Sequence, residues 1–121
     1  AMARIRHVAL FCKDAEKTAE FYRHLFDLKE VARNEGGAIY LSDGEVNLAL
    51  IQHGPRLSHE EIGINHCGFQ IEDMEAFRAR MKELGINQPL EKPDIPGSYF
   101  EYKMKDPDGN TLDVSEEGWA R

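Results

Sequence analysis

The chain has 121 residues, of which 41% are hydrophobic and 31% are charged, and its formal net charge is −7 at pH 7. These values are ordinary for one globular domain with a real core. The acidic balance, without a cluster of basic residues, argues against nucleic acid as a partner. The apolar runs are too short to span a membrane. The two cysteines lack metal-ligand spacing and are too few for a disulfide framework, so we expect a reduced, cytoplasmic protein.

One supersecondary unit occurs twice in the chain, offset by 59 positions. The stretch "IRHVALFCKD" at residues 5–14 corresponds to "INHCGFQIED" at residues 64–73, so that an isoleucine, a histidine and an aspartate recur at matching places. Both stretches alternate in polarity as strands do, and apolar residues at helical spacing follow each of them. We therefore predict a strand and then a helix in each half, with Asp14 and Asp73 as the helix N-caps.

Extended segments follow each predicted helix. They are expected at about residues 30–34, 38–41 and 46–52 in the first half, and at about residues 88–92, 99–105 and 111–116 in the second half. The turns "SDGE" and "DPDGN" join the last two segments of each half, and Asp-Gly is a strong hairpin signal. The prediction is a single α+β domain of two βαβββ modules over residues 2–121, with module 1 at about 4–52, a linker at 53–63 and module 2 at about 64–117.

Strand alternation sets which side chains share a face of the predicted sheet. The apolar alternates of each strand should face the helices, which leaves His7, His66 and Asp113 together on the opposite, concave face. A single strand histidine would more often be structural. Two histidines at matching repeat positions, together with an acid, instead indicate the two-histidine, one-carboxylate triad that holds a divalent metal and leaves positions open for substrate.

Three motifs resemble the vicinal oxygen chelate superfamily, which includes glyoxalases, extradiol dioxygenases, bleomycin-resistance proteins and fosfomycin-resistance enzymes. They are "IRHVALFCKDAEKTAEFYRHLF", "NHCGFQIED" and "YKMKDPDGNTLDVSE", and together they cover most of the chain. The resemblance implies a curved, barrel-like mixed sheet with the helices on its outer face and a divalent metal inside. It leaves the metal open among Fe, Mn, Ni, Zn and Co. It also implies a small-molecule substrate and a homodimer with the site at or near the subunit interface.

The family's metal positions fall on His7, His66 and Asp113, the last being a glutamate in most relatives. A fourth ligand is common late in the first module, but the corresponding position here is Ala49 or Leu48, neither of which can bind a metal. Proton transfer of the glyoxalase type would therefore need another group. The candidates are Glu101, Tyr102 and Glu117.

The expected function is a metal-dependent enzyme of the glyoxalase or extradiol dioxygenase type that chelates a small substrate through vicinal oxygens. The reaction class stays open between dioxygenase, lyase or isomerase, and transferase. The alternative is a non-catalytic small-molecule binding protein of the bleomycin-resistance type. The residues expected to contact substrate are Tyr40, Asn47, Gln70 and Lys103, and Trp119 is expected to be a C-terminal anchor or a dimer contact.

Overall fold

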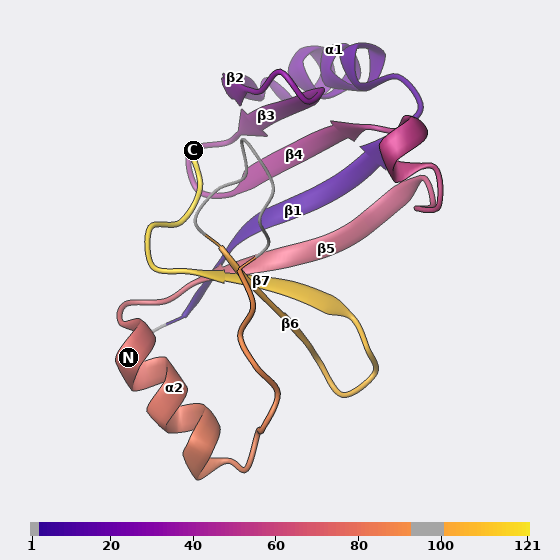
Figure 1. Cartoon of the computed structure of the whole chain (residues 1–121). Helices are drawn as coiled ribbons and strands as arrows, with labels where there is room; N and C mark the ends of the chain where they lie inside the picture. The colour runs from indigo at the N-terminus through magenta and orange to yellow at the C-terminus, as the bar shows by residue number, and fades with distance from the viewer. Residues whose placement is uncertain (1–2, 93–100) are drawn as a thin grey trace.

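The computed structural model describes residues 3–92 and 101–121. In chain order the elements are β1 (Arg4–Cys12), α1 (Ala15–Phe26), β2 (Lys29–Arg33), β3 (Ala38–Ser42), β4 (Asn47–Gln52), a 3-10 turn (Pro55–Leu57), β5 (Gly63–Gln70), α2 (Met74–Glu83), β6 (Tyr102–Lys105) and β7 (Thr111–Ser115). The strands form one mixed sheet in the order β2-β3-β4-β1-β5-β7-β6, which curves between the two helices (Figure 1). The predicted α+β fold with a curved, open sheet is confirmed. Neither helix in the described ranges is long and apolar enough to cross a bilayer.

Both helices begin at the predicted caps. The Asp14 side chain accepts a hydrogen bond from the Lys17 backbone N–H, and the Asp73 side chain accepts two from the first turn of α2. Asp27 ends α1 in the left-handed conformation with a φ of 60°, and Gly85 follows α2 with a φ of 72°. These residues tolerate the left-handed region because glycine lacks a Cβ and aspartate can bond locally. The helix boundaries thus follow from local sequence.

The repeated strands β1 and β5 lie side by side at the centre of the sheet. β1 pairs in parallel with β4 and antiparallel with β5, and β5 pairs in parallel with β7. In this register His7 lies opposite Gly68, and His66 lies opposite Ala9. The two matching histidines are therefore brought together within one chain.

The core lies between α1 and the strands of the first half. Its buried residues are Cys12, Ala15, Ala19, Ile39, Leu41 and Leu50. A second buried group, made of Ala9, Ala38, Tyr40 and Ala49, lies on the other face of the same strands. The predicted alternation holds, since Leu10 packs toward α1 and its neighbour Ala9 does not. Small side chains consequently line the sheet beside His7.

The segment expected to be a strand at residues 88–92 is instead irregular. Only Glu91 forms a β-bridge, with Lys103. Pro89 has no N–H to donate to a ladder, and the Gln88 side chain bonds both the N–H and the carbonyl of Lys105 in place of a neighbouring backbone. The strand expected at 99–105 begins at Tyr102, and residues 99 and 100 lie outside the described ranges.

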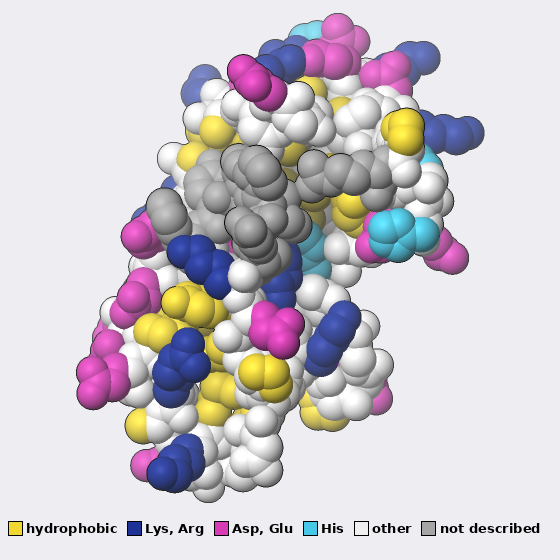
Figure 2. All heavy atoms as spheres, in the orientation of Figure 1, with side chains coloured by type: hydrophobic (Ala, Val, Ile, Leu, Met, Phe, Trp, Pro, Cys, Tyr) yellow, Lys and Arg dark blue, Asp and Glu magenta, His cyan; other side chains and the backbone are white. Residues whose placement is uncertain are grey.

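Acidic and basic side chains intermingle on the face shown in Figure 2. The described residues on that face form no broad basic patch.

Candidate metal centre

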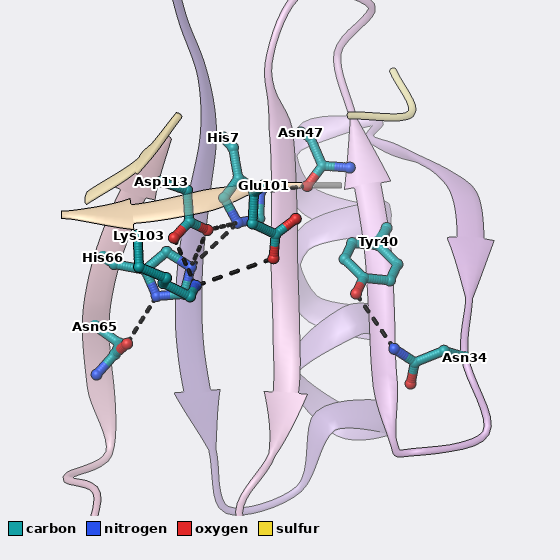
Figure 3. Close-up of polar contacts among 9 residues, drawn as sticks. All are labelled: His7, Asn34, Tyr40, Asn47, Asn65, His66, Glu101, Lys103 and Asp113. Atoms are coloured by element: carbon teal, nitrogen blue, oxygen red, sulfur yellow. Dashed lines mark hydrogen bonds and ion pairs between the residues drawn. The ribbon is translucent and has the colours of Figure 1, made fainter. Parts of the chain in front are cut away.

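Three side chains from three neighbouring strands meet in the middle of the sheet (Figure 3). His7 comes from β1, His66 from β5 and Asp113 from β7. The two Nε2 atoms are 3.3 Å apart, and the Asp113 Oδ2 atom is 3.0 Å from Nε2 of His66 and 3.9 Å from Nε2 of His7. His7 and Asp113 are both buried. The structure thus brings together the three residues that the repeat and its strand alternation predicted.

A buried asparagine sets the proton position on His7. Asn47 of β4 lies opposite His7 in the parallel register. Its Nδ2 donates to the carbonyl of Ala120 at 2.7 Å, so its Oδ1 faces Nδ1 of His7, at 2.8 Å. An amide oxygen can only accept, so Nδ1 of His7 carries the proton. The Nε2 atom is left with a lone pair that faces the centre of the triad.

A second asparagine does the same for His66. The Asn65 Nδ2 donates to Glu60, and its Oδ1 lies 2.7 Å from Nδ1 of His66. Neighbouring side chains of a regular strand point to opposite faces, but the pairing of β5 with β1 shifts register at Asn65. Such a bulge re-aims side chains, and here it brings the amide of Asn65 to the adjacent imidazole. Both histidines therefore carry a proton on Nδ1 and turn Nε2 toward Asp113.

The carboxylate of Asp113 is divided between two roles. Lys103 Nζ donates to Oδ1 at 2.5 Å, whereas Oδ2 is buried and has no hydrogen-bond partner among the described residues. Burial by itself would raise the pKa of Asp113. The contact with His66 and the positive charge of Lys103 outweigh that effect and hold the pKa below its usual value. Asp113 is thus a carboxylate whose Oδ1 is bonded to Lys103 and whose Oδ2 faces the two imidazoles.

These residues fit a divalent metal ion. Two imidazole Nε2 atoms and a carboxylate oxygen converge on one point, as metal ligands do, and a positive charge there would offset the charge of the buried carboxylate. Burial lowers the pKa of His7 to about 4, so its ring is neutral near pH 7, as a ligand must be. Each candidate ligand also has an outer hydrogen-bond partner, which is the usual arrangement around metal-binding histidines. Nitrogen and oxygen donors suit several first-row metals.

Of the two positions left open for a fourth ligand, Ala49 is the one that lines the cavity. Ala49 pairs with Ala9 of β1 and faces the cavity, whereas Leu48 packs toward the α1 core. Matching the strand end gives Ala49, and counting from the Asp-Gly hairpin gives Leu48.

A cavity of about 750 Å³ opens in front of the triad. One wall belongs to the first half of the chain and is mostly apolar; it includes Phe11, Ala38, Tyr40, Ala49 and Ile51. The opposite wall carries polar and charged groups, namely Glu101, Lys103, Lys105 and Thr111. The cavity can therefore hold a molecule with a charged end beside the lysines and a less polar end against the alanines.

The remaining candidates from the sequence divide into two groups. Tyr40, Glu101 and Lys103 line the cavity, and Asn47 lies behind His7. Tyr102 and Gln70 do not line it. Because side chains alternate along β6, Tyr102 lies on the face opposite Lys103, with the guanidinium of Arg78 5.5 Å from its ring centroid. Gln70 is bonded through Nε2 to the carbonyl of Glu116, and Glu117 is exposed.

Asn47 was predicted to contact substrate and instead bonds His7. Two further contacts of the histidines were not anticipated. One is the Asn65 partner of His66, which depends on a bulge that strand alternation does not predict. The other is the indole of Trp119, which stacks on the His7 ring with the centroids 4.6 Å apart and the planes 3° from parallel. The sequence indicated an anchoring role for Trp119 but not the surface on which it packs.

A family model described as the Glyoxalase/Bleomycin resistance protein/Dioxygenase superfamily matches residues 4–114. The chain belongs to this superfamily. Among curated proteins it is similar to the fosfomycin resistance protein FosX of Listeria innocua, with 30% identity over a match of 100 residues that covers 77% of this chain and 74% of FosX.

Two solved structures share this fold over nearly the whole length of the chain. Streptomyces coelicolor methylmalonyl-CoA epimerase is 21% identical, with a TM-score of 0.61 and complete coverage of both chains. The 2,3-dioxygenase LapB of Pseudomonas sp. KL28 is 18% identical, with a TM-score of 0.72, and the match covers 97% of this chain and 41% of LapB. The names of these relatives denote different activities, so membership of the superfamily does not select a reaction.

Proposed function

We propose that this chain is a divalent-metal-dependent enzyme that acts on a small, oxygen-rich anion, with His7, His66 and Asp113 as the metal ligands. The observation that carries the proposal is the convergence of the two Nε2 atoms on Oδ2 of Asp113, an oxygen without a hydrogen-bond donor among the described residues. When bound, a divalent metal supplies Lewis-acid chemistry to two adjacent substrate oxygens and stabilises the negative charge that develops on them. The identity of the metal stays open among Fe, Mn, Ni, Zn and Co.

The charges of the site favour an anionic substrate. The two histidines contribute no charge when they act as ligands, and Asp113 and the proposed base Glu101 contribute one negative charge each. A divalent ion and Lys103 would together exceed that negative charge. The Lys103 ammonium has three protons and uses one on Asp113, so it retains donors for an anionic substrate in the cavity. Tyr40, on the opposite wall, is proposed to contact the less polar end.

Glu101 is the proposed proton-transfer group. Its side chain is buried and lines the same cavity, with its Oε1 atom 4.0 Å from Lys103 Nζ. A carboxylate there can accept a proton from a substrate carbon or from water beside the reacting oxygens. Tyr102 faces α2 and Glu117 is exposed, so we leave both out of the proposed mechanism.

The test is elemental analysis of protein purified without chelators, comparing the wild type with His66→Ala and Glu101→Gln. We expect stoichiometric metal in the wild type and in E101Q, and loss of metal in H66A, because of the two substituted residues His66 is a proposed ligand and Glu101 is not. Turnover of a panel of small hydroxy and oxo acids should then require both the metal and Glu101. Equal trace metal in all three proteins would refute the proposal. Tight binding of such an acid without metal would favour the non-catalytic binding protein.

We also propose a homodimer formed through the outer face of the central strands. Ile5 of β1 is 59% exposed and Ile64 of β5 is 78% exposed. They pair with Phe69 and Leu10 respectively, and Leu10 packs toward α1, away from the cavity. Exposed apolar side chains of this size favour burial against another surface. Light scattering should give a dimer mass for the wild type and a lower mass for Ile64→Lys; a monomeric wild type would refute this assembly.

A further inference from the structure

The end of the chain returns to the candidate metal centre, where Trp119 is among the residues that line the cavity. We call residues 116–121 the C-terminal arm. Trp119 of the arm is only 5% exposed, and its indole covers the flat side of the His7 imidazole in a nearly parallel stack. A ring covered in this way cannot swing about its Cα–Cβ bond without displacing the indole. The arm therefore restricts the direction in which His7 presents Nε2.

The next residue of the arm controls the proton on the same ring. The carbonyl of Ala120 accepts from Asn47 Nδ2, which leaves Asn47 Oδ1 as the acceptor for Nδ1 of His7. If that carbonyl were removed, the amide could turn and present its NH₂ group to Nδ1. The imidazole proton would then move to Nε2, and the ring would lose the lone pair that faces Asp113.

The local sequence makes room for the arm. A Cβ at Gly68 would lie 2.5 Å from the Trp119 ring and 3.0 Å from the His7 Cβ, so a larger residue there would exclude the stack. Gly118 has a φ of 73°, a conformation in which glycine is strongly preferred, and its N–H donates to the buried Ser115 side chain. Gln70 holds the carbonyl of Glu116. The arm is thus fixed at several points before it reaches His7.

His66 has no corresponding support. Its outer partner Asn65 belongs to the same strand and is exposed. Among the described residues, an aromatic ring stacks flat on His7 but none stacks flat on His66. A change in the arm should therefore affect one ligand and leave the other two unchanged.

We infer that the C-terminal arm is part of the metal centre: Trp119 and the Ala120 carbonyl are positioning groups that hold His7 in its metal-binding orientation and tautomer. The inference rests on the proposed metal function for its consequence, which is tighter metal binding. The tautomer itself can be measured in metal-free protein. An arm that only anchored the chain would affect stability without changing the proton position on one particular ring.

The experiment compares Trp119→Leu, Trp119→Phe and a chain ending at Gly118 with the wild type. Leucine keeps apolar volume without a flat ring, whereas phenylalanine keeps a ring that can stack. Phe21→Ala is the control, because it removes an exposed aromatic of α1 that is remote from the site. Zn²⁺ affinity is measured by calorimetry, and the histidine tautomers of metal-free protein are read from ¹H–¹⁵N correlation spectra, with His7→Gln assigning the His7 signals.

We expect the chain ending at Gly118 to bind Zn²⁺ about 10–100-fold more weakly, as for other outer partners of metal ligands. The Zn²⁺ affinity of W119L should also be lower than that of the wild type, whereas the affinities of W119F and F21A should stay close to it. The Nδ1–H signal of His7 should weaken in the truncated chain while that of His66 is unchanged. A folded truncated chain with wild-type Zn²⁺ affinity and an unchanged His7 tautomer would overturn the inference. Absence of Zn²⁺ binding by the wild type would count against the proposed function. A change of the His7 tautomer on truncation would still support the inference that the C-terminal arm positions His7.

Discussion

The two halves of the chain repeat one unit but pack differently. In the first half (Arg4–Gln52), α1 covers the strands and encloses a continuous buried core. In the second half (residues 63–115), α2 lies at the other end of the sheet and extends away from it (Figure 1). Met81 is the buried residue of this helix. Leu84, at the end of α2, is 63% exposed.

The halves also support the metal site in different ways. His7 of the first half is held by the buried Asn47 and covered by Trp119. The second half contributes His66 with an exposed partner, together with Asp113 and its ion pair to Lys103. The comparison indicates that buried contacts hold the ligand of the first half, and that the second half contributes most of the charged groups of the site.

The largest expected contrast is in stability. Leu50 is fully buried in the α1 core, so Leu50→Ala should lower the free energy of unfolding by about 2–5 kcal/mol through lost burial and a cavity. Leu84→Ala in the second half should change it by less than about 0.5 kcal/mol, because that side chain is largely exposed. Urea denaturation monitored by circular dichroism measures both. Equal losses would mean that α2 contributes to the core as α1 does.

The buried histidine of the first half should make stability depend on pH. Burial lowers the pKa of His7 from 6.5 to about 4 in the folded protein. Between these values the unfolded chain binds a proton that the folded chain does not, so stability falls as the pH decreases from 6.5 to 4. The expected loss is about 3 kcal/mol at roughly 1.4 kcal/mol per pH unit.

Denaturation of chelator-treated protein across this pH range measures that loss. In His7→Gln the corresponding part of the slope should be absent, so the variant and the wild type should converge toward pH 4. Parallel curves for the two proteins would show that His7 is not the source of the pH dependence.

The smallest expected contrast concerns the outer partners of the two histidines. Asn47→Leu should weaken Zn²⁺ binding by about 10–100-fold, since it leaves the buried Nδ1–H of His7 without an acceptor. Asn65→Leu should cost less than about 10-fold, because water can replace an exposed amide. Calorimetric titration with Zn²⁺ compares the two. A larger loss of Zn²⁺ affinity in Asn65→Leu than in Asn47→Leu would contradict the conclusion that His7 is the more firmly held of the two histidines.

Features that depend on neighbouring residues in the chain could be predicted well. The caps at Asp14 and Asp73, the left-handed end of α1 at Asp27 and the first-half strands appear near the expected positions. The strand predicted at 88–92 failed because a side chain, that of Gln88, took over the hydrogen bonds of a β-ladder. Periodicity cannot anticipate such a replacement.

The sequence by itself determined which residues could form the candidate site. The repeat and the period-2 alternation were enough to put His7, His66 and Asp113 on one face, because alternation is a local property of any strand. Only the tertiary structure decided how those residues are held. The bulge at Asn65, the choice of Ala49 over Leu48, the outward turn of Tyr102 and the return of Trp119 to His7 all depend on register between strands and on the docking of distant segments. Local pattern does not encode those contacts, since they form only when segments far apart in the chain pack together.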